Sequence, residues 1–563
     1  MKVIIIGGVA GGASAAARLR RLDEKAEITV YERSGFVSYA NCGLPYYVGG
    51  VITDKSELTL KTPESFKTRF DIDIKVLHEV TAIDTAKKTV TVRDIKGGLV
   101  FEDSYDKLIL SPGAKASLPP FEVPASDRIF TLRTVEDSFA TREFIEIKKP
   151  ASAIVLGGGF IGLEMAENLT EAGIKTTVVE LAPHLLKTFD GDMASMIHAC
   201  FRKNGVDLVL GTGASGIAAE GEKIALHFSG KPDLNADMLI LALGVTPDTE
   251  LAKKAGLSLG SRGSILVNDR METSAKDVYA VGDAVEVRYL IAGNKALISL
   301  AGPANKQGRI AADNACGGSS TYGGSMGASV IKIFDMTAAS VGLTQEYAET
   351  LGFDSEAIII SSGSHASYYP GARNMWIKAI FERGTNRILG AQIVGYEGVD
   401  KRIDVIAASI KLGASIIDLK DLELAYAPPY SSAKDPVNVI GLIAENVATG
   451  KFTQFHVEDI DALPRDGSVT LLDARTPAEY EKGHIDGFIN IQLDELRDRL
   501  TELPEGKPVY INCQSGLRSY IACRMLTQYG FECHNLAGGY GFYNAVKTER
   551  LAAESSWPCG MEK

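Results

Sequence analysis

Two cysteines of the chain stand in settings that favour sulfur chemistry, and the first is Cys42. It occurs in the segment Asn41-Cys42-Gly43-Leu44-Pro45, in which Pro45 is expected to start a helix. A thiolate near a helix N-terminus has a lowered pKa. No second cysteine follows at the C-x-x-x-x-C spacing of a dithiol pair. Unless Cys42 is only a small buried residue, it must take a sulfur partner from outside or be oxidised to a sulfenic acid.

The second candidate is Cys513, which follows a strand expected over residues 509–512. Six residues from Cys513 to Arg518 form a loop that leads into a helix through residues 520–529. Inward N–H groups of such a loop, together with the positive end of the helix, would stabilise a thiolate or a bound anion. Only four residues separate Cys513 from Arg518, so the ring is better suited to sulfur than to phosphate.

One unit that could position this chemistry occurs twice, over residues 3–32 and 153–180. Each copy consists of a strand, a glycine turn, a helix and a second strand that ends in an acidic residue. Glycine lets the backbone approach a pyrophosphate at a helix N-terminus, and the acid accepts hydrogen bonds from ribose. Two nucleotide sites are therefore predicted. Val9 replaces the middle glycine of the first turn, which we expect to widen that turn or to shift the phosphate. The candidate binding residues are Gly7, Gly8, Ala10, Gly11, Gly12, Glu32 and Arg33 in the first unit, and Gly157, Gly159, Phe160, Ile161, Gly162 and Glu180 in the second.

Length and composition limit the class of protein. The 563 residues suggest about three to five domains, and 45% hydrophobic with 23% charged residues are typical of a globular chain. A formal charge of −12 argues against nucleic-acid and membrane-surface partners. Seven cysteines without a C-x-x-C pair indicate no zinc site and a reducing compartment. No apolar run could span a bilayer, so we expect a cytoplasmic protein with no metal and no membrane contact.

Two further strand-and-turn segments, residues 105–114 and 278–283, complete a resemblance to the flavoprotein disulfide reductases. That resemblance implies that the first unit binds FAD, with help from Asn41, Ser111, Pro112, Gly113, Gly282 and Asp283, and that the flavin lies near Cys42. It also implies that the second unit binds a nicotinamide. Because Glu180 would repel a 2′-phosphate, NADH is expected in preference to NADPH.

More specifically, the segment from Ser38 to Tyr46 resembles the cysteine loop of the CoA-disulfide reductases, and residues 367–371, 425–431 and 434–436 extend the match. The resemblance implies that Tyr368 and Tyr426 enter the active site from the partner subunit of a homodimer. Interface packing is the competing interpretation, and it is favoured for Tyr369 and Tyr430. The implied CoA contacts are Ser14, Arg18, Arg21, Ser38, Asn41, Asn305 and Lys434.

From about residue 455 the chain resembles the rhodanese domain, with Asp473 to Tyr480, the Cys513 loop and Asn535 to Tyr540 as the matching segments. Cys513 and Arg518 are the implied catalytic residues. His484 is expected to order the turn at Asp473 and Arg475 rather than to act as a base. The remaining cysteines are expected to be bystanders: Cys200, Cys316, Cys523, Cys533 and Cys559.

The expected fold is α/β, with two Rossmann-like FAD- and NAD(P)-binding domains, an α+β dimerisation domain and a C-terminal α/β rhodanese domain. The expected boundaries are 1–115 and 245–322 for the FAD-binding domain, 116–244 for the NADH-binding domain, 325–447 for the dimerisation domain, and 455–555 for the rhodanese domain.

The predicted function is NADH-dependent, FAD-mediated reduction of CoA persulfide, polysulfide and CoA disulfide, coupled to sulfur transfer. One alternative is an NADH oxidase or peroxidase, in which Cys42 cycles through a sulfenic acid. Another is a sulfur carrier or redox sensor. The sequence leaves open which sulfur compound is the physiological substrate, and whether Cys513 passes sulfur to CoA or directly to Cys42.

Overall fold

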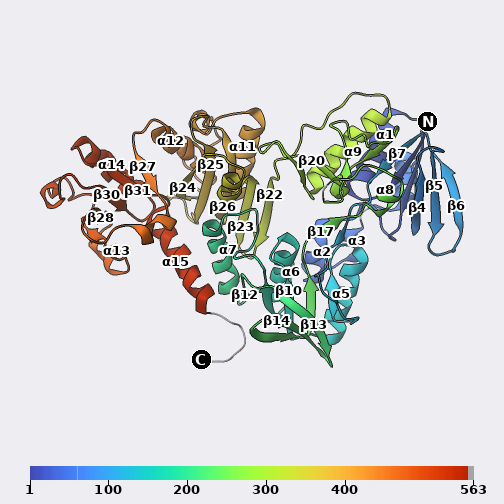
Figure 1. Cartoon of the computed structure of the whole chain (residues 1–563), viewed down its shortest axis with the longest axis horizontal. Helices are drawn as coiled ribbons and strands as arrows, with labels where there is room; N and C mark the ends of the chain where they lie inside the picture. The colour runs from blue at the N-terminus through green and yellow to red at the C-terminus, as the bar shows by residue number, and fades with distance from the viewer. Residues whose placement is uncertain (60, 261, 556–563) are drawn as a thin grey trace. The chain divides into compact units, whose positions relative to one another are not determined.

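The computed structural model describes residues 1–59, 61–260 and 262–555. It divides into two compact units (Figure 1). The first unit comprises Met1–Leu181 and Thr212–Gly327. The second comprises Ala182–Gly211 and the chain from Ala328 onward. Cys559 lies outside the described residues.

The first unit opens with a parallel five-stranded sheet. Ile5 of its central strand lies opposite Val30 on one side and Ile109 on the other. That strand is apolar and almost wholly buried, as in parallel sheets covered on both faces. In spatial order the strands are β19 (Val278–Ala280), β7 (Lys107–Leu110), β1 (Lys2–Ile6), β2 (Glu27–Glu32) and β3 (Asp73–Val76).

Helices α1 (Ala10–Leu22) and α9 (Ala301–Ala315) pack closely on one another beside this sheet. A Cβ atom on Gly308 would lie 2.3 Å from the carbonyl oxygen of Gly11, so the helices can approach only with glycine there. Smaller elements complete this part of the unit. They are β4 (His78–Asp84), β5 (Thr89–Asp94) and β6 (Val100–Ser104), which form an antiparallel sheet; β18 (Ile265–Leu266), β20 (Val285–Arg288) and β21 (Lys295–Leu297); and α3 (Lys55–Leu58), α4 (Pro63–Phe70) and α8 (Glu250–Lys254).

A second parallel sheet in the same unit repeats the strand, glycine turn and helix arrangement. Its strands lie in the order β11 (Lys175–Val179), β10 (Ser152–Leu156), β16 (Met238–Leu241) and β9 (Ile129–Thr131). The elements around it are α5 (Val135–Lys148), α6 (Phe160–Glu171), the antiparallel strands β13 (Ala214–Glu220), β14 (Lys223–Phe228) and β15 (Lys231–Ala236), and the pair β8 (Ala114–Ala116) and β17 (Val245–Pro247).

The second unit contains an antiparallel five-stranded sheet with helices, which is the expected α+β part. Its strands lie in the order β22 (Ser329–Ile333), β23 (Met336–Gly342), β26 (Ile388–Gly395), β25 (Asn374–Glu382) and β24 (Ser355–Gly363). The helices of this part are α7 (Gly191–Lys203), α10 (Gln345–Thr350), α11 (Val399–Leu412) and α12 (Pro436–Ala448).

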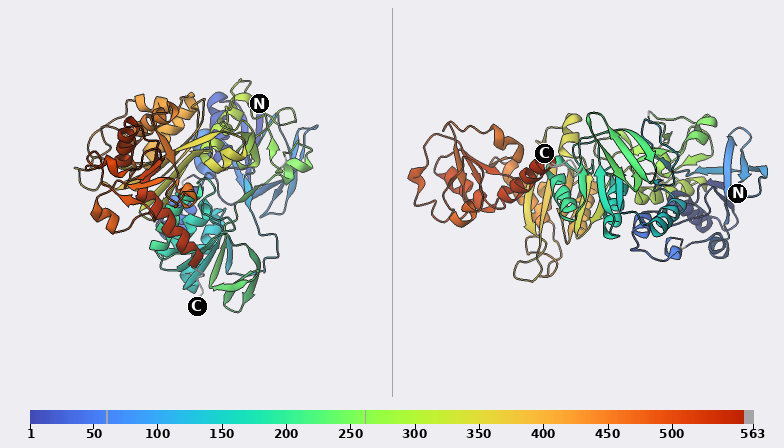
Figure 2. Two further views of the ribbon diagram at one scale, coloured as in Figure 1. Left: turned by 60° about the vertical axis from the view of Figure 1, so that its left-hand side comes forward. Right: turned by 90° about the horizontal axis from the view of Figure 1, so that it is seen from below.

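The C-terminal part of the second unit is built on a parallel five-stranded sheet, drawn from orange to red in Figure 2. Its strands lie in the order β27 (Thr453–Phe455), β31 (Cys533–Leu536), β30 (Val509–Asn512), β28 (Thr470–Asp473) and β29 (Ile489–Asn490). The helices of this part are α13 (Pro477–Glu481), α14 (Leu517–Gln528) and α15 (Gly539–Ser555).

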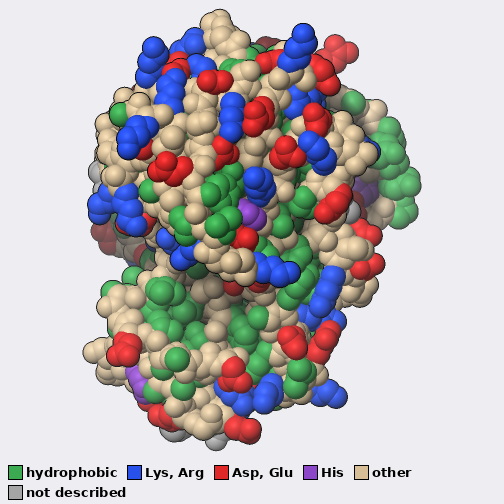
Figure 3. Space-filling view, turned by 90° about the vertical axis from the view of Figure 1, so that its right-hand side faces the viewer, with side chains coloured by type: hydrophobic (Ala, Val, Ile, Leu, Met, Phe, Trp, Pro, Cys, Tyr) green, Lys and Arg blue, Asp and Glu red, His purple; other side chains and the backbone are tan. Residues whose placement is uncertain are grey.

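These sheets confirm the predicted α/β fold class. On the face shown in Figure 3, basic and acidic side chains are interspersed and form no continuous basic area. A search of the described residues finds no helix with the length and hydrophobicity that a membrane crossing requires.

A buried ion-pair cluster joins α7 to the antiparallel sheet of the second unit. Lys378 on β25 is 4% exposed, and its Nζ lies 2.9 Å from Asp192 Oδ2 and 3.1 Å from Asp190 Oδ2. Gln392 on β26 donates a further 2.7 Å hydrogen bond to Asp190. Lys378 thus offsets part of the desolvation cost of placing these carboxyl groups in the interior.

Replacing Lys378 by methionine should therefore destabilise this unit. Breaking a buried ion pair costs about 3 kcal/mol, which corresponds to a fall of about 6 °C in the midpoint of thermal unfolding. Differential scanning calorimetry of the whole chain measures it. Lys411→Met, at an exposed position of α11, is the matched control and should shift the midpoint by less than about 1 °C. Equal shifts for both variants would contradict this interpretation.

Candidate functional site

The first glycine turn brings the end of β1 against the segment that follows β7. Gly7 has a φ of +95°, and a Cβ atom there would lie 2.1 Å from the carbonyl oxygen of Ser111. A Cβ on Gly12 would lie 1.8 Å from the carbonyl oxygen of Gly7. Only glycine fits at these two positions. Helix α1 then begins at Ala10, and no side chain caps the free N–H groups of its first turn. This end of α1 can therefore receive a phosphate.

Glu32, the acid of the first unit, ends β2 beside this turn and is almost fully buried. Its Oε2 accepts a 2.8 Å hydrogen bond from the N–H of Gly8, and its Oε1 accepts one of the same length from Ser34 N. Burial raises the pKa of Glu32. Arg33 is ion-paired with Asp248 at 2.7 Å, so its guanidinium is held beside that carboxylate.

The other residues predicted for the first nucleotide lie at the same carboxyl edge of the sheet. Ser111, Pro112 and Gly113 follow β7, and Gly282 and Asp283 follow β19. Asp283 is ion-paired with Arg133 at 2.7 Å. The surrounding donors and acceptors fit the Asn41 side chain when its amide oxygen and nitrogen are exchanged. In that orientation the amide oxygen accepts a 2.8 Å hydrogen bond from Nη1 of Arg133. Arg133, which sequence reasoning missed, thus links Asp283 to the segment that carries Cys42.

The second glycine turn repeats the first between β10 and α6. A Cβ atom on Gly157, whose φ is +118°, would lie 2.3 Å from the carbonyl oxygen of Ala242. A Cβ on Gly162 would lie 2.0 Å from the carbonyl oxygen of Gly157. At Gly159, by contrast, a Cβ atom would meet no protein atom within 4 Å. Protein packing therefore does not require glycine at 159, and the open space suits the close approach of a ligand.

Three further predicted residues surround the second turn. Glu180 follows β11, and its Oε2 accepts a 2.6 Å hydrogen bond from Gly158 N. Phe160 and Ile161 form the start of α6, and both are half-buried. The second turn thus has the same arrangement of turn, helix and acid as the first.

Cys42 lies in a short 3-10 helix, Asn41–Gly43, that leads into α2 (Leu44–Val48). The residue is exposed, yet its surroundings raise the pKa of the thiol, mainly by desolvation and next through the charge of Glu164. Arg133 acts in the opposite direction and lowers this pKa. The lowered pKa expected from a following helix is therefore not found, because desolvation and, after it, the charge of Glu164 raise the pKa.

Glu164 is a second residue that sequence reasoning missed. It lies on α6, and its Oε1 accepts a 3.5 Å hydrogen bond from the hydroxyl of Tyr46 on α2. Desolvation and the neighbouring Glu167 raise the pKa of Glu164 to about 7. Glu164 lies one helical turn after Phe160, and this spacing was the sequence signal that could have identified it as a site residue. The helix of the second glycine turn therefore supplies a titratable group near Cys42.

A cavity of about 340 Å³ lies beside α1 and has both basic and apolar walls. It is lined by five of the predicted CoA contacts: Ser14, Arg18, Arg21, Ser38 and Asn305. Arg18 is ion-paired with Asp313 at 2.6 Å, and the hydroxyl of Ser14 donates a 2.8 Å hydrogen bond to Asn305. Asn41 is not part of the lining, and Lys434 belongs to the second unit.

The cavity also has lining residues that were not predicted, notably Lys61, Phe66, Phe70 and Arg309. Arg309 follows Asn305 by four residues on α9, so helical spacing could have identified it. Nothing in the local sequence marked the others, because the fold alone brings them to α1. Cationic side chains beside two phenyl rings suit a ligand that carries both phosphate groups and an apolar portion.

In the second unit, the hydroxyls of Tyr368 and Tyr426 lie 2.7 Å apart, within hydrogen-bond distance. Tyr368 is 74% exposed and Tyr426 45% exposed, so the pair lies at the surface of the described chain. The hydrogen bond to Tyr368 raises the pKa of Tyr426. Of the other two tyrosines, Tyr369 packs edge-on against His365, and Tyr430 is exposed.

The loops that carry this pair are held together by a buried arginine on α11. Arg402 is 1% exposed, and its Nη2 donates to the carbonyl oxygen of Ser364 at 3.0 Å and to Asp435 Oδ2 at 3.1 Å. The N–H of Ala366 donates to the carbonyl oxygen of Ser431 at 3.0 Å, which joins the loops directly. Arg402 is a positioning residue that no local sequence signal marked.

At the C-terminal sheet, Cys513 follows β30 and is fully buried. Its Sγ accepts hydrogen bonds of 3.2 Å from Gly516 N and from the hydroxyl of Ser519. Gly516 has a φ of +95°, a conformation that suits glycine, and α14 starts directly after it. The expected loop is therefore present, with neutral donors on the sulfur.

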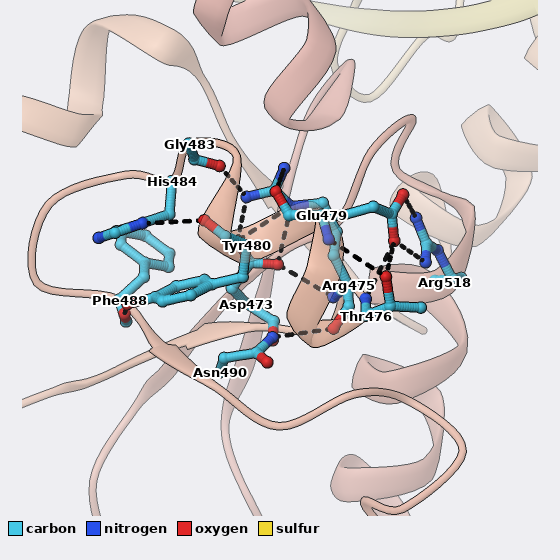
Figure 4. A network of polar contacts seen from close by, with 10 residues as sticks. All are labelled: Asp473, Arg475, Thr476, Glu479, Tyr480, Gly483, His484, Phe488, Asn490 and Arg518. Atoms are coloured by element: carbon cyan, nitrogen blue, oxygen red, sulfur yellow. Dashed lines mark hydrogen bonds and ion pairs between the residues drawn. The ribbon is translucent and has the colours of Figure 1, made fainter.

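Arg518 closes the loop and is paired with Glu479 on α13, as Figure 4 shows. His484 stacks on Tyr480, and one of its ring nitrogens contacts the carbonyl oxygen of that residue. The adjacent Gly483 accepts a 2.8 Å hydrogen bond from Arg475. His484 thus lies beside the turn of Asp473 and Arg475. Among the bystander cysteines within the described residues, Cys200, Cys523 and Cys533 are buried and Cys316 is half-buried.

The position of Arg402 generates a testable expectation about the tyrosine loops. Arg402→Met leaves the buried carboxylate of Asp435 without its guanidinium and removes the link to Ser364. We therefore expect faster hydrogen exchange in the backbone of residues 364–372 and 426–435, measured by mass spectrometry of the whole chain. Arg387→Met, on another arginine of the same unit, is the control. Unchanged protection in both loops of the Arg402 variant would contradict the assignment.

Comparisons with known proteins agree with this arrangement of parts. A family profile described as pyridine nucleotide-disulphide oxidoreductase matches residues 1–308, and the profile for the dimerisation domain of the same family matches 328–436. A rhodanese-like domain profile matches residues 456–545.

Individual relatives cover most of the chain. Coenzyme A disulfide reductase of Staphylococcus haemolyticus (strain JCSC1435) is 37% identical over 454 residues, which are 79% of this chain and 100% of that protein. The solved structure of reduced Bacillus anthracis CoADR-RHD is 46% identical and covers 98% of both chains with a TM-score of 0.94. That of a NAD-dependent persulfide reductase from A. fulgidus is 38% identical and covers 96% of this chain and 100% of the other, with a TM-score of 0.90. The chain therefore belongs to the pyridine nucleotide-disulphide oxidoreductase family and carries a rhodanese domain at its C-terminal end.

Proposed function

We propose that this chain is an NADH-dependent flavoprotein that reduces CoA disulfide, CoA persulfide and related polysulfides. The observation that carries the proposal is the position of Cys42. It lies four residues after Ser38, which lines the basic cavity, and it is close to α6, the helix of the second glycine turn. One thiol thus lies near both a site suited to a phosphate-bearing ligand and a nucleotide-binding helix.

The cradle at the first turn fits FAD, since backbone approach and uncapped N–H groups are what a pyrophosphate needs. The residues proposed to hold it are Gly7, Gly8, Ala10, Gly11, Gly12, Glu32, Arg33, Asn41, Ser111, Pro112, Gly113, Gly282 and Asp283. When bound, FAD accepts an electron pair from NADH and passes it to sulfur. NADH is proposed to bind at Gly157, Gly159, Phe160, Ile161, Gly162 and Glu180, and the carboxylate of Glu180 disfavours the 2′-phosphate of NADPH.

Cys42 acts in this proposal as the nucleophile. Its thiolate attacks one sulfur of CoA disulfide, so that one CoA thiolate leaves and Cys42 holds the other half as a mixed disulfide. The overall change is NADH, a proton and CoA disulfide to NAD⁺ and two CoA thiols. With CoA persulfide the products are NAD⁺, one CoA thiol and hydrogen sulfide. Glu164 is suited to hold a proton near Cys42, because its pKa lies near neutrality.

The chain is further proposed to act as a homodimer in which Tyr368 and Tyr426 of one subunit serve Cys42 of the other. Two phenols in hydrogen-bond contact can donate a proton to a departing thiolate, and the surface exposure of the pair is compatible with use across an interface. Lys434 would contact CoA across the same dimer. Asn41, which precedes Cys42 in the chain, is proposed as a further CoA contact.

In the C-terminal part, Cys513 is proposed to accept a sulfane sulfur and to pass it to CoA or towards Cys42, with Arg518 closing its loop. The division into an FAD-binding domain (1–115 and 245–322), an NADH-binding domain (116–244), a dimerisation domain (325–447) and a rhodanese domain (455–555) is part of the proposal. A cytoplasmic location, with small-molecule substrates, completes the proposal. The odd and sparse set of seven cysteines, which fits a reducing compartment, supports it.

Cys42→Ser should abolish NADH-linked reduction of CoA disulfide and CoA persulfide, because the attacking sulfur is lost. We expect a fall in kcat of about three orders of magnitude or more, with FAD still bound as judged by the visible absorption spectrum. Cys316→Ser, at another partly exposed cysteine of the same unit, should retain activity. NADH consumption under nitrogen measures both. Full turnover by the Cys42 variant would refute the proposal, and NADH consumption that requires oxygen would favour the oxidase alternative.

Arg21→Gln tests the cavity as the CoA site. Loss of one charge-assisted contact to phosphate should raise the KM for CoA disulfide about tenfold and leave kcat nearly unchanged. Lys25→Gln removes the same charge at a nearby exposed position that does not line the cavity, so its KM should stay within about twofold. Steady-state kinetics give both values. Equal KM values for the Arg21 variant and the unaltered chain would argue against this site.

A further inference from the structure

The guanidinium of Arg518, at the end of the Cys513 loop, is occupied by a carboxylate of the same domain. Its Nη1 lies 2.7 Å from Glu479 Oε2, and its Nη2 lies 2.7 Å from Glu479 Oε1 (Figure 4). Two parallel charge-assisted hydrogen bonds form a strong and directional pair. The cation that closes the loop is therefore matched by a negative charge.

Glu479 is itself fixed by the helix on which it lies. Thr476 donates to Glu479 Oε2 through its N–H at 3.0 Å and through its hydroxyl at 2.9 Å, and that hydroxyl accepts from Glu479 N at 3.3 Å. These contacts form a capping box at the start of α13. The hydrogen bonds from Arg518 hold the pKa of Glu479 at about 2, so the carboxylate is ionised at neutral pH. Turning the carboxylate away from Arg518 would also break its two hydrogen bonds with Thr476.

The remaining donors on the sulfur of Cys513 are neutral. Gly516 N and the Ser519 hydroxyl each donate to Sγ at 3.2 Å. A donor with two negative charges, such as thiosulfate, is repelled by the Glu479 carboxylate and gains less attraction from Arg518 while that ion pair holds. A persulfide carries at most one charge on its reacting sulfurs. The charge distribution at this loop therefore discriminates between the two donor classes.

We propose that Glu479 is a specificity-determining residue which, by holding Arg518, makes Cys513 prefer persulfide donors to dianionic donors. This inference rests on the proposed function, since it assumes that Cys513 accepts sulfur. In the step, the Cys513 thiolate attacks the outer sulfur of R–S–S–H. The S–S bond of the donor breaks, R–S⁻ leaves with the electron pair, and Cys513–S–S–H keeps the proton. No external oxidant or reductant is needed.

Glu479→Gln in the full-length holoprotein tests the inference, because glutamine also fits the third position of a capping box. Thiocyanate formation from cyanide is measured with thiosulfate and with glutathione persulfide as donors, and Cys513→Ser gives the background. We expect the kcat/KM for thiosulfate to rise about tenfold, mainly through a lower KM. The value for the persulfide should stay within about twofold. Glu479→Ala, which removes the charge without adding an amide, provides a second measurement.

Glu481→Gln is the matched control, because it removes one charge from an exposed position of the same helix. It should leave the ratio of the two kcat/KM values unchanged. If Glu479→Gln alters both donors equally, or if Glu481→Gln shifts the ratio as much, the inference is wrong. If the Glu479→Gln variant transfers sulfur with an unaltered ratio of the two kcat/KM values, the inference is overturned but the sulfur-transfer function stands. Failure of the unaltered chain to transfer sulfur from either donor overturns it together with the sulfur-transfer function.

Discussion

Cys42 is a thiol without a neighbouring partner thiol, and the proposed chemistry follows from that fact. Cys42 has no second cysteine at the spacing of a dithiol pair, so in the proposed function every cycle uses a sulfur atom brought from outside. The proposal assigns parts of that need to the cavity lined by Ser38, to the paired hydroxyls of Tyr368 and Tyr426, and to the rhodanese domain.

A carboxylate lies near each of the two sulfur sites. Each carboxylate weakens the stabilisation that a nearby arginine could give to a negatively charged sulfur. Near Cys42, desolvation and Glu164 raise the pKa of the thiol, although Arg133 opposes them. At the Cys513 loop, Glu479 binds Arg518, and the sulfur is left with the neutral donors Gly516 N and Ser519. In this account, ionisation of Cys42 depends on the ligands that bind beside it, and charge at the Cys513 loop serves selectivity more than attraction.

Sequence reasoning predicted the features that depend on short, fixed spacings. The glycines at 7, 12, 157 and 162, the acids at 32 and 180, and the Cys513 loop all lie within single local units, whose geometry is set by backbone contacts. Five of the seven predicted CoA contacts also line one cavity, because Ser14, Arg18 and Arg21 lie on a single helix.

What could not be predicted depends on segments that are far apart in the chain. Arg402 binds groups of residues 364 and 435, and Glu479 binds an arginine 39 positions later, so neither contact has a local signature. The raised pKa of the Cys42 thiol was not predicted for a related reason. It comes first from desolvation by the surrounding fold and next from the charge of Glu164 on α6, more than a hundred residues further along the chain.

The most direct test of the central claim is to locate the CoA adduct on the protein. The oxidised holoprotein is reduced by one equivalent of NADH under nitrogen, mixed with CoA disulfide, quenched with acid and digested for mass spectrometry. We expect CoA to be attached to the peptide that carries Cys42, and we expect that adduct to be lost when excess NADH is added before the quench. An adduct confined to other cysteines, or one on Cys42 that NADH cannot remove, would contradict the central claim.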